Sequence, residues 1–261
     1  MKSNDQGSTA AGAAPARELG DLAPLIHDRS PEVLRAVAAD RRLTEDLALA
    51  LLARRDLPAE ALEQLAKNQA VMKHRKVFNA IVAHLKTPRH VSVPIIRRLY
   101  TFELMHLALT PVVHADIKVA AEDALIARLE SVAAGERLTL AKRSSGGVAA
   151  ALLLDAERRI VEAALANPQM TENWIIRALM NSKASTALVE MVCNHSKWSL
   201  RRDIRLALLR NDKISMAKAI FFAQSLPSMA LRDVLHHSHL SPNVREYLLR
   251  VLEERPQGIK E

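Results

Sequence analysis

The fold is decided between residues 167 and 215, NPQMTENWIIRALMNSKASTALVEMVCNHSKWSLRRDIRLALLRNDKIS. Four similar turns recur here, each with mostly polar residues, then one apolar residue, then Ser or Thr: NPQMT, NSKAS, HSKWS and NDKIS. They begin at residues 167, 181, 195 and 211, so the steps are 14, 14 and 16 residues. Related turns begin at residues 40 (DRRLT), 54 (RRDLP), 88 (PRHVS) and 237 (HSHLS). A unit that recurs at this spacing is an internal repeat.

Each repeat predicts one short helix. Asn167 and Asn211 are expected to end the preceding helices, because Asn tolerates the left-handed conformation common there. About ten residues remain between turns, roughly 15 Å of helix, which is too short to be stable alone. We therefore expect an all-α fold, a right-handed α-solenoid of short helical repeats with a beat of ~14 residues. The hydroxyl residues expected to cap the helix starts are Thr44, Thr171, Ser199, Ser215 and Ser241.

The regular spacing breaks near the middle of the chain. The pattern from residue 115 to residue 134 predicts one longer helix, and GERLTLAKR predicts a short one that ends at SSGG. We expect tails at residues 1–17 and 257–261, N-terminal repeats at 18–134 and C-terminal repeats at 135–256. One continuous helix could bridge the two stacks, so they need not be independent domains.

Three segments carry a resemblance to a known family: RRIVEAALANPQMT, HSKWSLRRDIRLALLRNDKIS and LSPNVREYLLRVLEE. They resemble bacterial HEAT-like and leucine-rich-repeat-variant helical proteins of unassigned function. The resemblance covers about residues 140–254 well and the N-terminal half only through its turns. It implies HEAT-like repeats that serve as a scaffold or regulator, and in some relatives as a DNA-binding or glycosylase module.

Composition and motifs argue against several classes of protein. Cys193 is the single cysteine, which excludes an internal disulfide and favours a small buried residue in a reducing compartment. No run approaches the ~18 apolar residues that span a bilayer, and the start has no secretory segment, so we expect a cytoplasmic protein without a membrane partner. His236, His237 and His239 invite a metal hypothesis, but adjacent helical residues point ~100° apart, so we predict no metal site.

Catalysis also lacks support. The sequence has no nucleophile elbow, phosphate-cradling glycine loop or HExxH helix. Asp155 and Glu157 are interpreted as solvated charges at a helix start. A HEAT-like glycosylase would need a catalytic acid and aromatic residues, yet Trp174 and Trp198 are the only tryptophans. We predict no enzyme activity, no catalytic residues and no cofactor.

Basic residues give the best functional signal, since the formal net charge is +8. Residues 64–102 contain eight Lys or Arg and no acid, but residues 18–63 and 103–136 each have a net charge of −4. This stretch is therefore interpreted as an electrostatic match between neighbouring repeats. Residues 137–261 have a net charge of +7. Their densest basic cluster comprises Lys197, Trp198, Arg201, Arg202, Arg205, Arg210 and Lys213.

Two functional hypotheses come first, and a HEAT-like DNA glycosylase is the third alternative. The leading one is a non-enzymatic scaffold or adaptor that binds a macromolecule, most simply a protein, through the concave surface of the solenoid. The alternative is a module that binds the phosphate backbone of nucleic acid through the basic cluster, with Trp198 stacking on a base. The repulsion between Arg201 and Arg205, about 0.2–0.5 kcal/mol at i,i+4, would be relieved by such an anion or by a nearby carboxylate.

Overall fold

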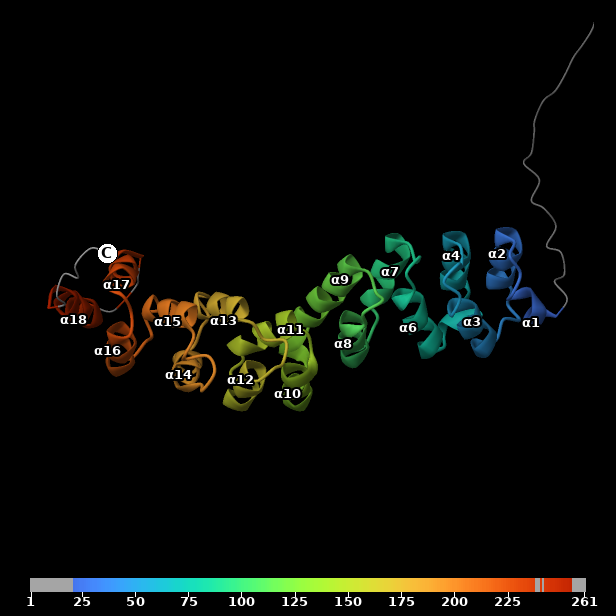
Figure 1. Cartoon of the computed structure of the whole chain (residues 1–261). Helices are drawn as coiled ribbons and strands as arrows, with labels where there is room; N and C mark the ends of the chain where they lie inside the picture. The colour runs from blue at the N-terminus through green and yellow to red at the C-terminus, as the bar shows by residue number, and fades with distance from the viewer. Residues whose placement is uncertain (1–20, 238–239, 241, 255–261) are drawn as a thin grey trace, which may run out of the picture. The chain divides into compact units, whose positions relative to one another are not determined.

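The computed structural model describes residues 21–237, 240 and 242–254. Over these residues the chain forms α-helices and two short 3₁₀ helices without any strand, so the predicted all-α class is confirmed (Figure 1). None of the helices in this part of the chain combines the length and apolar character needed to cross a membrane. The predicted tails at 1–17 and 257–261, the Ser241 cap and His239 lie outside the described residues.

The chain divides into two compact units, residues 1–91 and 92–261. In the first unit, α2 packs against α4 and α3 packs against α6. Leu51, Leu62 and Leu65 are fully buried there. The helices of this unit are α1 (Leu22–Leu25), α2 (Pro31–Ala39), α3 (Glu45–Leu52), α4 (Ala59–Lys67), α5 (Gln69–Met72) and α6 (Arg75–Ala83), and α7 (Arg89–Ile96) spans the division.

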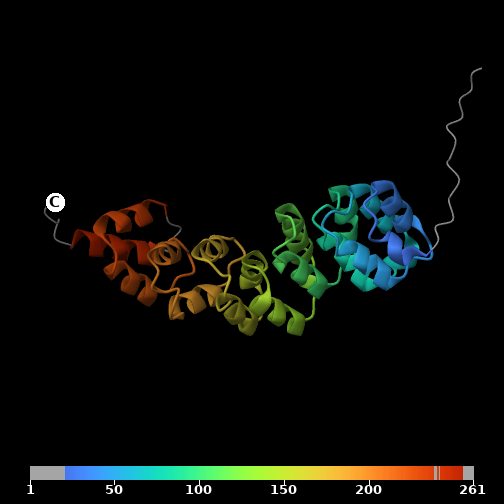
Figure 2. The ribbon, with the colours of Figure 1, turned by 45° about the vertical axis from the view of Figure 1, so that its right-hand side comes forward.

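In the second unit, helices contact the helix two positions along the chain. These pairs are α10 with α12, α12 with α14, α11 with α13, α13 with α15, and α15 with α17 (Figures 1 and 2). The elements are α8 (Thr101–Leu109), α9 (Ala115–Ile126), η1 (Leu129–Ser131), α10 (Ala134–Arg143), α11 (Gly146–Ala151), η2 (Leu152–Leu154), α12 (Arg158–Leu165), α13 (Glu172–Leu179), α14 (Thr186–Asn194), α15 (Arg202–Leu209), α16 (Met216–Gln224), α17 (Ser228–His237) and α18 (Pro242–Glu253).

The long helix predicted over residues 115–134 is wrong. Helix α9 ends at Ile126, and the 3₁₀ turn η1 separates it from α10. The Arg128 side chain donates hydrogen bonds to the carbonyls of Arg97 and Leu99, and the Ser131 hydroxyl donates to the Arg128 carbonyl at 2.8 Å. The Ser131 N–H and hydroxyl both bond to the Arg128 carbonyl, whereas a continuous α-helix would bond that carbonyl to the Val132 N–H. The division of the chain falls at residues 91 and 92, so the expected boundary at residue 134 lies inside the second unit. The predicted short helix GERLTLAKR is present as α10.

Helix starts follow the predicted turns in most repeats. Thr44 and Ser185 each accept a hydrogen bond from the backbone N–H three residues later. Thr171 and Ser215 stand at the same N-cap position without such a bond. The cap predicted at Ser199 is wrong, because α15 begins three residues later. This repeat is two residues longer than its neighbours, and the extra residues lengthen the turn.

Side chains in the turns also hydrogen-bond to earlier repeats. Asn167 accepts from the Gln169 N–H at 2.7 Å, while its amide donates to the carbonyls of Ala141 (2.8 Å) and Ser144 (3.1 Å) at the end of α10. Helix ends leave carbonyls without intrahelical partners, so this side chain completes the hydrogen bonding of another helix. We call such a contact, from a turn side chain to a carbonyl about 23–33 residues earlier, a turn latch.

Turn latches recur in both units. Asn68 donates to the carbonyls of Ala38 (3.0 Å) and Asp40 (2.8 Å), and Asn211 donates to the Leu179 carbonyl at 2.6 Å. The sequence assigned Asn167 and Asn211 a backbone role at a helix end, but their side chains make the decisive contacts.

Residues other than Asn make the same contact elsewhere. Arg54 donates to the carbonyls of Ile26 (2.6 Å) and Asp28 (2.7 Å). His84 contacts the Arg54 carbonyl through Nε2 at 2.9 Å and accepts from the Lys86 N–H through Nδ1 at 3.2 Å. Its ring thus presents a donor and an acceptor in the same arrangement as an Asn amide.

Candidate binding groove and basic cluster

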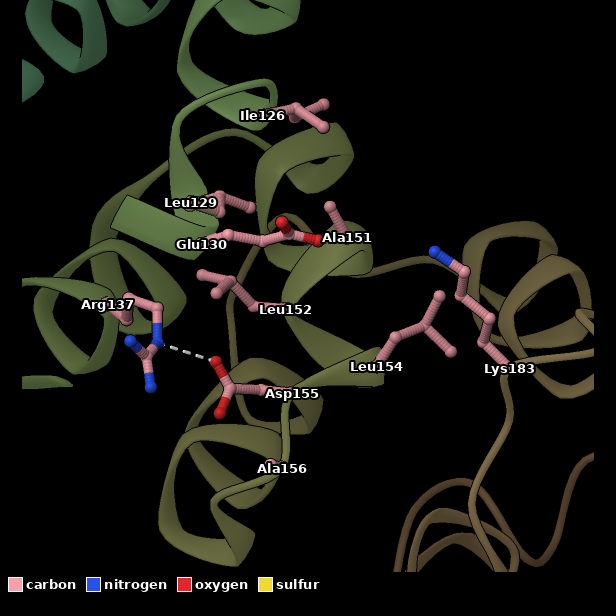
Figure 3. A pocket seen from close by; sticks show the side chains of 10 residues that line it. All are labelled: Ile126, Leu129, Glu130, Arg137, Ala151, Leu152, Leu154, Asp155, Ala156 and Lys183. Carbon is pink, nitrogen blue, oxygen red and sulfur yellow. Dashed lines mark hydrogen bonds and ion pairs between the residues drawn. The ribbon is translucent and has the colours of Figure 1, made fainter. Parts of the chain in front are cut away.

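An open groove of about 480 Å³ lies in the second unit, where the regular repeats are interrupted (Figure 3). Its apolar lining comes from the end of α9, from η1 and from the junction of α11 with η2. Leu129 and Leu152 are buried beneath it, Leu154 is half-buried, and Ile126 is exposed at the edge. The small side chains of Ala151 and Ala156 leave the space open. The groove therefore has an apolar floor in which Ala151 and Leu154 are the partly exposed residues.

An ion pair forms one wall of the groove. The Arg137 Nε atom lies 2.7 Å from the Asp155 carboxylate, and the two side chains are only 19% and 8% exposed. Arg137 also donates to the Val132 carbonyl at 2.8 Å and to Glu157 at 3.4 Å. Asp155 further accepts from the Glu157 N–H at 2.9 Å. A half-buried pair with its donors and acceptors satisfied has a structural role. The interpretation of Asp155 as a solvated charge is therefore wrong.

The two other charged residues of the groove have opposite signs. Glu130 and Lys183 are exposed and lie on either side of Ala151 (Figure 3). Within the described part of the chain, neither the Glu130 carboxylate nor the Lys183 ammonium makes a hydrogen bond or an ion pair. The Lys183 backbone is fixed by its N–H, which donates to the Asn181 side chain at 2.9 Å. The groove thus combines an apolar floor with one free anion and one free cation.

The ionisable side chains of the groove lining are Glu130, Arg137, Asp155 and Lys183. Its lining contains no Ser, Cys or His that could act as a nucleophile beside the Asp155 carboxylate. Over residues 21–237, 240 and 242–254, no three His, Cys, Asp or Glu side chains are grouped to hold a metal ion. Of the histidine cluster, His236 is exposed, and the side chain of His237 lies outside the described residues.

In the basic cluster, the proposed stacking role of Trp198 is wrong. Its side chain is 2% exposed, and its Nε1–H donates to the Leu165 carbonyl at 2.9 Å, which is a turn latch. The Lys197 ammonium lies 4.0 Å from the centre of the indole ring. A nucleic-acid base stacks on an exposed aromatic face, and the buried side chain of Trp198 presents no such face.

Most arginine and lysine side chains of the basic cluster have intramolecular partners. Arg201 pairs with Glu172 at 3.3 Å, so a carboxylate relieves its repulsion with Arg205. Arg205 donates to the Ser199 carbonyl (2.7 Å) and the Ser225 hydroxyl (3.0 Å).

The remaining members differ in their contacts. Arg210 pairs with Asp233, and Lys213 donates to the Ala184 carbonyl. Arg202 is exposed. The cluster therefore lies along α15 and its flanking turns, with much of its charge used inside the protein.

Two histidines of the stretch at residues 64–102 lie against carboxylates of the preceding segment, whereas the match predicted for its Lys and Arg stays a prediction. His74 lies 3.0 Å from the Glu45 carboxylate, and His90 lies 3.3 Å from that of Glu63. Each pair joins a later turn or helix to an earlier one in the first unit. The acidic partners stand within the segment of opposite net charge, although the basic partners are histidines.

Comparison with known proteins gives no match, since no family model, no curated protein and no solved structure is significantly similar to this chain. The resemblance to HEAT-like proteins stays a prediction. Sequence reasoning also missed the groove, because its residues come from three separated segments, near 126–137, 151–156 and 183. One signal pointed to this region, the interruption of the 14-residue spacing after residue 115.

Proposed function

We propose that this protein is a non-catalytic right-handed α-solenoid of HEAT-like repeats that binds another protein through its concave surface, with the groove as a docking point. The turn latches support the repeat assignment, because most of them span about twice the 14-residue beat. A cytoplasmic location is part of the proposal, and the buried thiol of Cys193 agrees with a reducing compartment.

The open groove with its free Glu130 and Lys183 carries this proposal. Protein interfaces combine an apolar centre with a polar rim, and this groove has both. A small-molecule site encloses 70–90% of its ligand, whereas the exposed edge at Ile126 and Ala156 leaves this groove open. A partner larger than the groove can cover the edge and the floor together.

The test compares two exposed alanines replaced by the same residue. Ala156→Arg fills the groove, and Ala187→Arg adds the same charge and bulk on the exposed face of α14. Tagged variants are used to capture partners from the source cell, with and without nuclease. We expect a protein that survives nuclease treatment and is lost only with Ala156→Arg. Partners that vanish with nuclease, or that bind both variants equally, would contradict the proposal.

Nucleic-acid binding is the second candidate, favoured by the net charge of +7 over residues 137–261. It predicts retardation of oligonucleotides that weakens steeply with salt. Replacing Arg201 and Arg205 by Glu should abolish it, but those changes also break contacts with Glu172 and the Ser199 carbonyl. Arg202→Glu is the sharper test, because this side chain is exposed and makes no ion pair within the described residues. Unchanged retardation would exclude the basic cluster.

A further inference from the structure

The charges of the groove set requirements on whatever binds there. Four ionisable side chains line it, and the pair of Arg137 with Asp155 is neutral and satisfied. The remaining two, Glu130 and Lys183, carry opposite charges and stand apart on the rim (Figure 3). Covering them without a partner would remove each from water at a cost. A well-matched ligand therefore supplies a cation toward Glu130 and an anion toward Lys183.

The apolar floor sets the third requirement. Leu129, Leu152 and Leu154 supply the hydrocarbon of the groove lining, and Ala151 stands between the two charges (Figure 3). A volume of about 480 Å³ lies within the ~300–1,000 Å³ of ordinary ligand pockets. It has room for one large apolar side chain and its adjoining backbone. Burying such a side chain is the main source of affinity in a site of this kind.

Other ligands match these features less well. A nucleic acid or an anionic lipid surface would bring negative charge toward the free Glu130 carboxylate. A wholly apolar ligand would leave both rim charges without partners. A polypeptide segment can place a basic, an apolar and an acidic side chain within a few residues.

We propose that the groove binds a segment of a partner protein in which one large apolar residue is flanked by a Lys or Arg that meets Glu130 and by an Asp or Glu that meets Lys183. This inference rests on the proposed function and specifies the partner's chemistry. The apolar residue supplies most of the affinity, and the two rim pairs supply selectivity. Exposed ion pairs contribute up to ~1 kcal/mol, which corresponds to about fivefold in affinity for the pair at Glu130 and for the pair at Lys183.

A displayed library of random 16-residue peptides, selected on the full-length protein, tests this directly. Peptides are retained if Ala156→Arg weakens their binding and Ala187→Arg does not. We expect the retained set to share one large apolar residue with a basic and an acidic residue close to it. Glu130→Lys should weaken these peptides about fivefold, and replacing the peptide's basic residue by Glu should restore binding to that variant. Lys183→Glu should behave likewise toward the peptide's acidic residue.

The outcomes separate this inference from the proposed function. The inference is supported if the matching peptide change restores binding to both Glu130→Lys and Lys183→Glu. It is overturned if, at either position, the losses from the protein change and the peptide change simply add. A library that yields no peptide sensitive to Ala156→Arg also overturns it. If the cellular partner still depends on Ala156 while no charge coupling is found, the proposed function stands and the charge rule is wrong. If cellular capture fails as well, both are wrong.

Discussion

Replacing Asn167 by Ala tests whether the turn latches stabilise the stacked helices. The Asn167 side chain is 3% exposed and makes three hydrogen bonds, two of them to carbonyls of the buried residues Ala141 and Ser144. A buried polar group left without a partner costs about 1–3 kcal/mol. The variant leaves two such carbonyls without this donor, which together cost about 2–6 kcal/mol. Since the end of α10 can relax and regain part of this loss, we expect the free energy of unfolding of the second unit to fall by about 2–4 kcal/mol.

Tryptophan fluorescence during urea unfolding measures this change. Trp174 and Trp198, the only tryptophans, both lie in the second unit, so their signal reports that unit alone. Asn181→Ala is the matched control, because Asn181 begins an equivalent turn but is exposed and accepts a single hydrogen bond from the Lys183 N–H. We expect the control to lose about 0.5 kcal/mol. Equal losses for the two variants would refute the stabilising role of the latch.

Three further predictions concern single side chains. Trp198→Phe leaves the buried Leu165 carbonyl without its donor and should lower stability by about 1–3 kcal/mol, read by circular dichroism in urea. Burial, together with the nearby Lys197, lowers the pKa of His195 in the folded protein below its usual 6.5. As the pH falls, the unfolded chain therefore binds a proton at this histidine before the folded chain does. The free energy of unfolding should be highest above about pH 6.5 and should fall as the pH drops toward the folded pKa. His195→Asn, the residue used in other turns, should flatten this decline in unfolding curves at pH 5–8. Burial raises the pKa of the Cys193 thiol from 9.0 to about 11, so a disulfide reagent at pH 8 should react about a hundredfold more slowly with the folded protein than in urea; equal rates would contradict the burial.

The helical class and most turns could be predicted because the signals are local. A hydroxyl after a short polar turn and an apolar stripe of helical period are determined by neighbouring residues. Thr44 and Ser185 illustrate this, since each hydroxyl accepts a hydrogen bond from a backbone N–H only three residues later. Ser199 does not, because the two additional residues of its repeat change the length of the turn.

The groove and the turn latches could not be predicted in this way. The partners of Asn167 and Trp198 lie 23–33 residues earlier, and no local pattern identifies which carbonyl each side chain reaches. The local pattern over residues 115–134 likewise did not show that the Arg128 side chain, just after the end of α9, bonds to carbonyls about 30 residues away. Long-range contacts of this kind override local helix propensity.

The groove lies where the repeat is interrupted, and the structural role of turn residues in the other repeats explains this position. Where the spacing is regular, a turn residue can be committed to the fold, as Asn167 is through its bonds to the end of α10. Around η1 and η2 the spacing is interrupted, and the side chains there are released from that pattern. Glu130 can then stand free beside an apolar floor while Arg137 and Asp155 maintain the irregular backbone, and Lys183 reaches the groove from the neighbouring regular turn. In a repeat protein whose regular positions serve stability, a binding site is therefore expected at an interruption of the repeat.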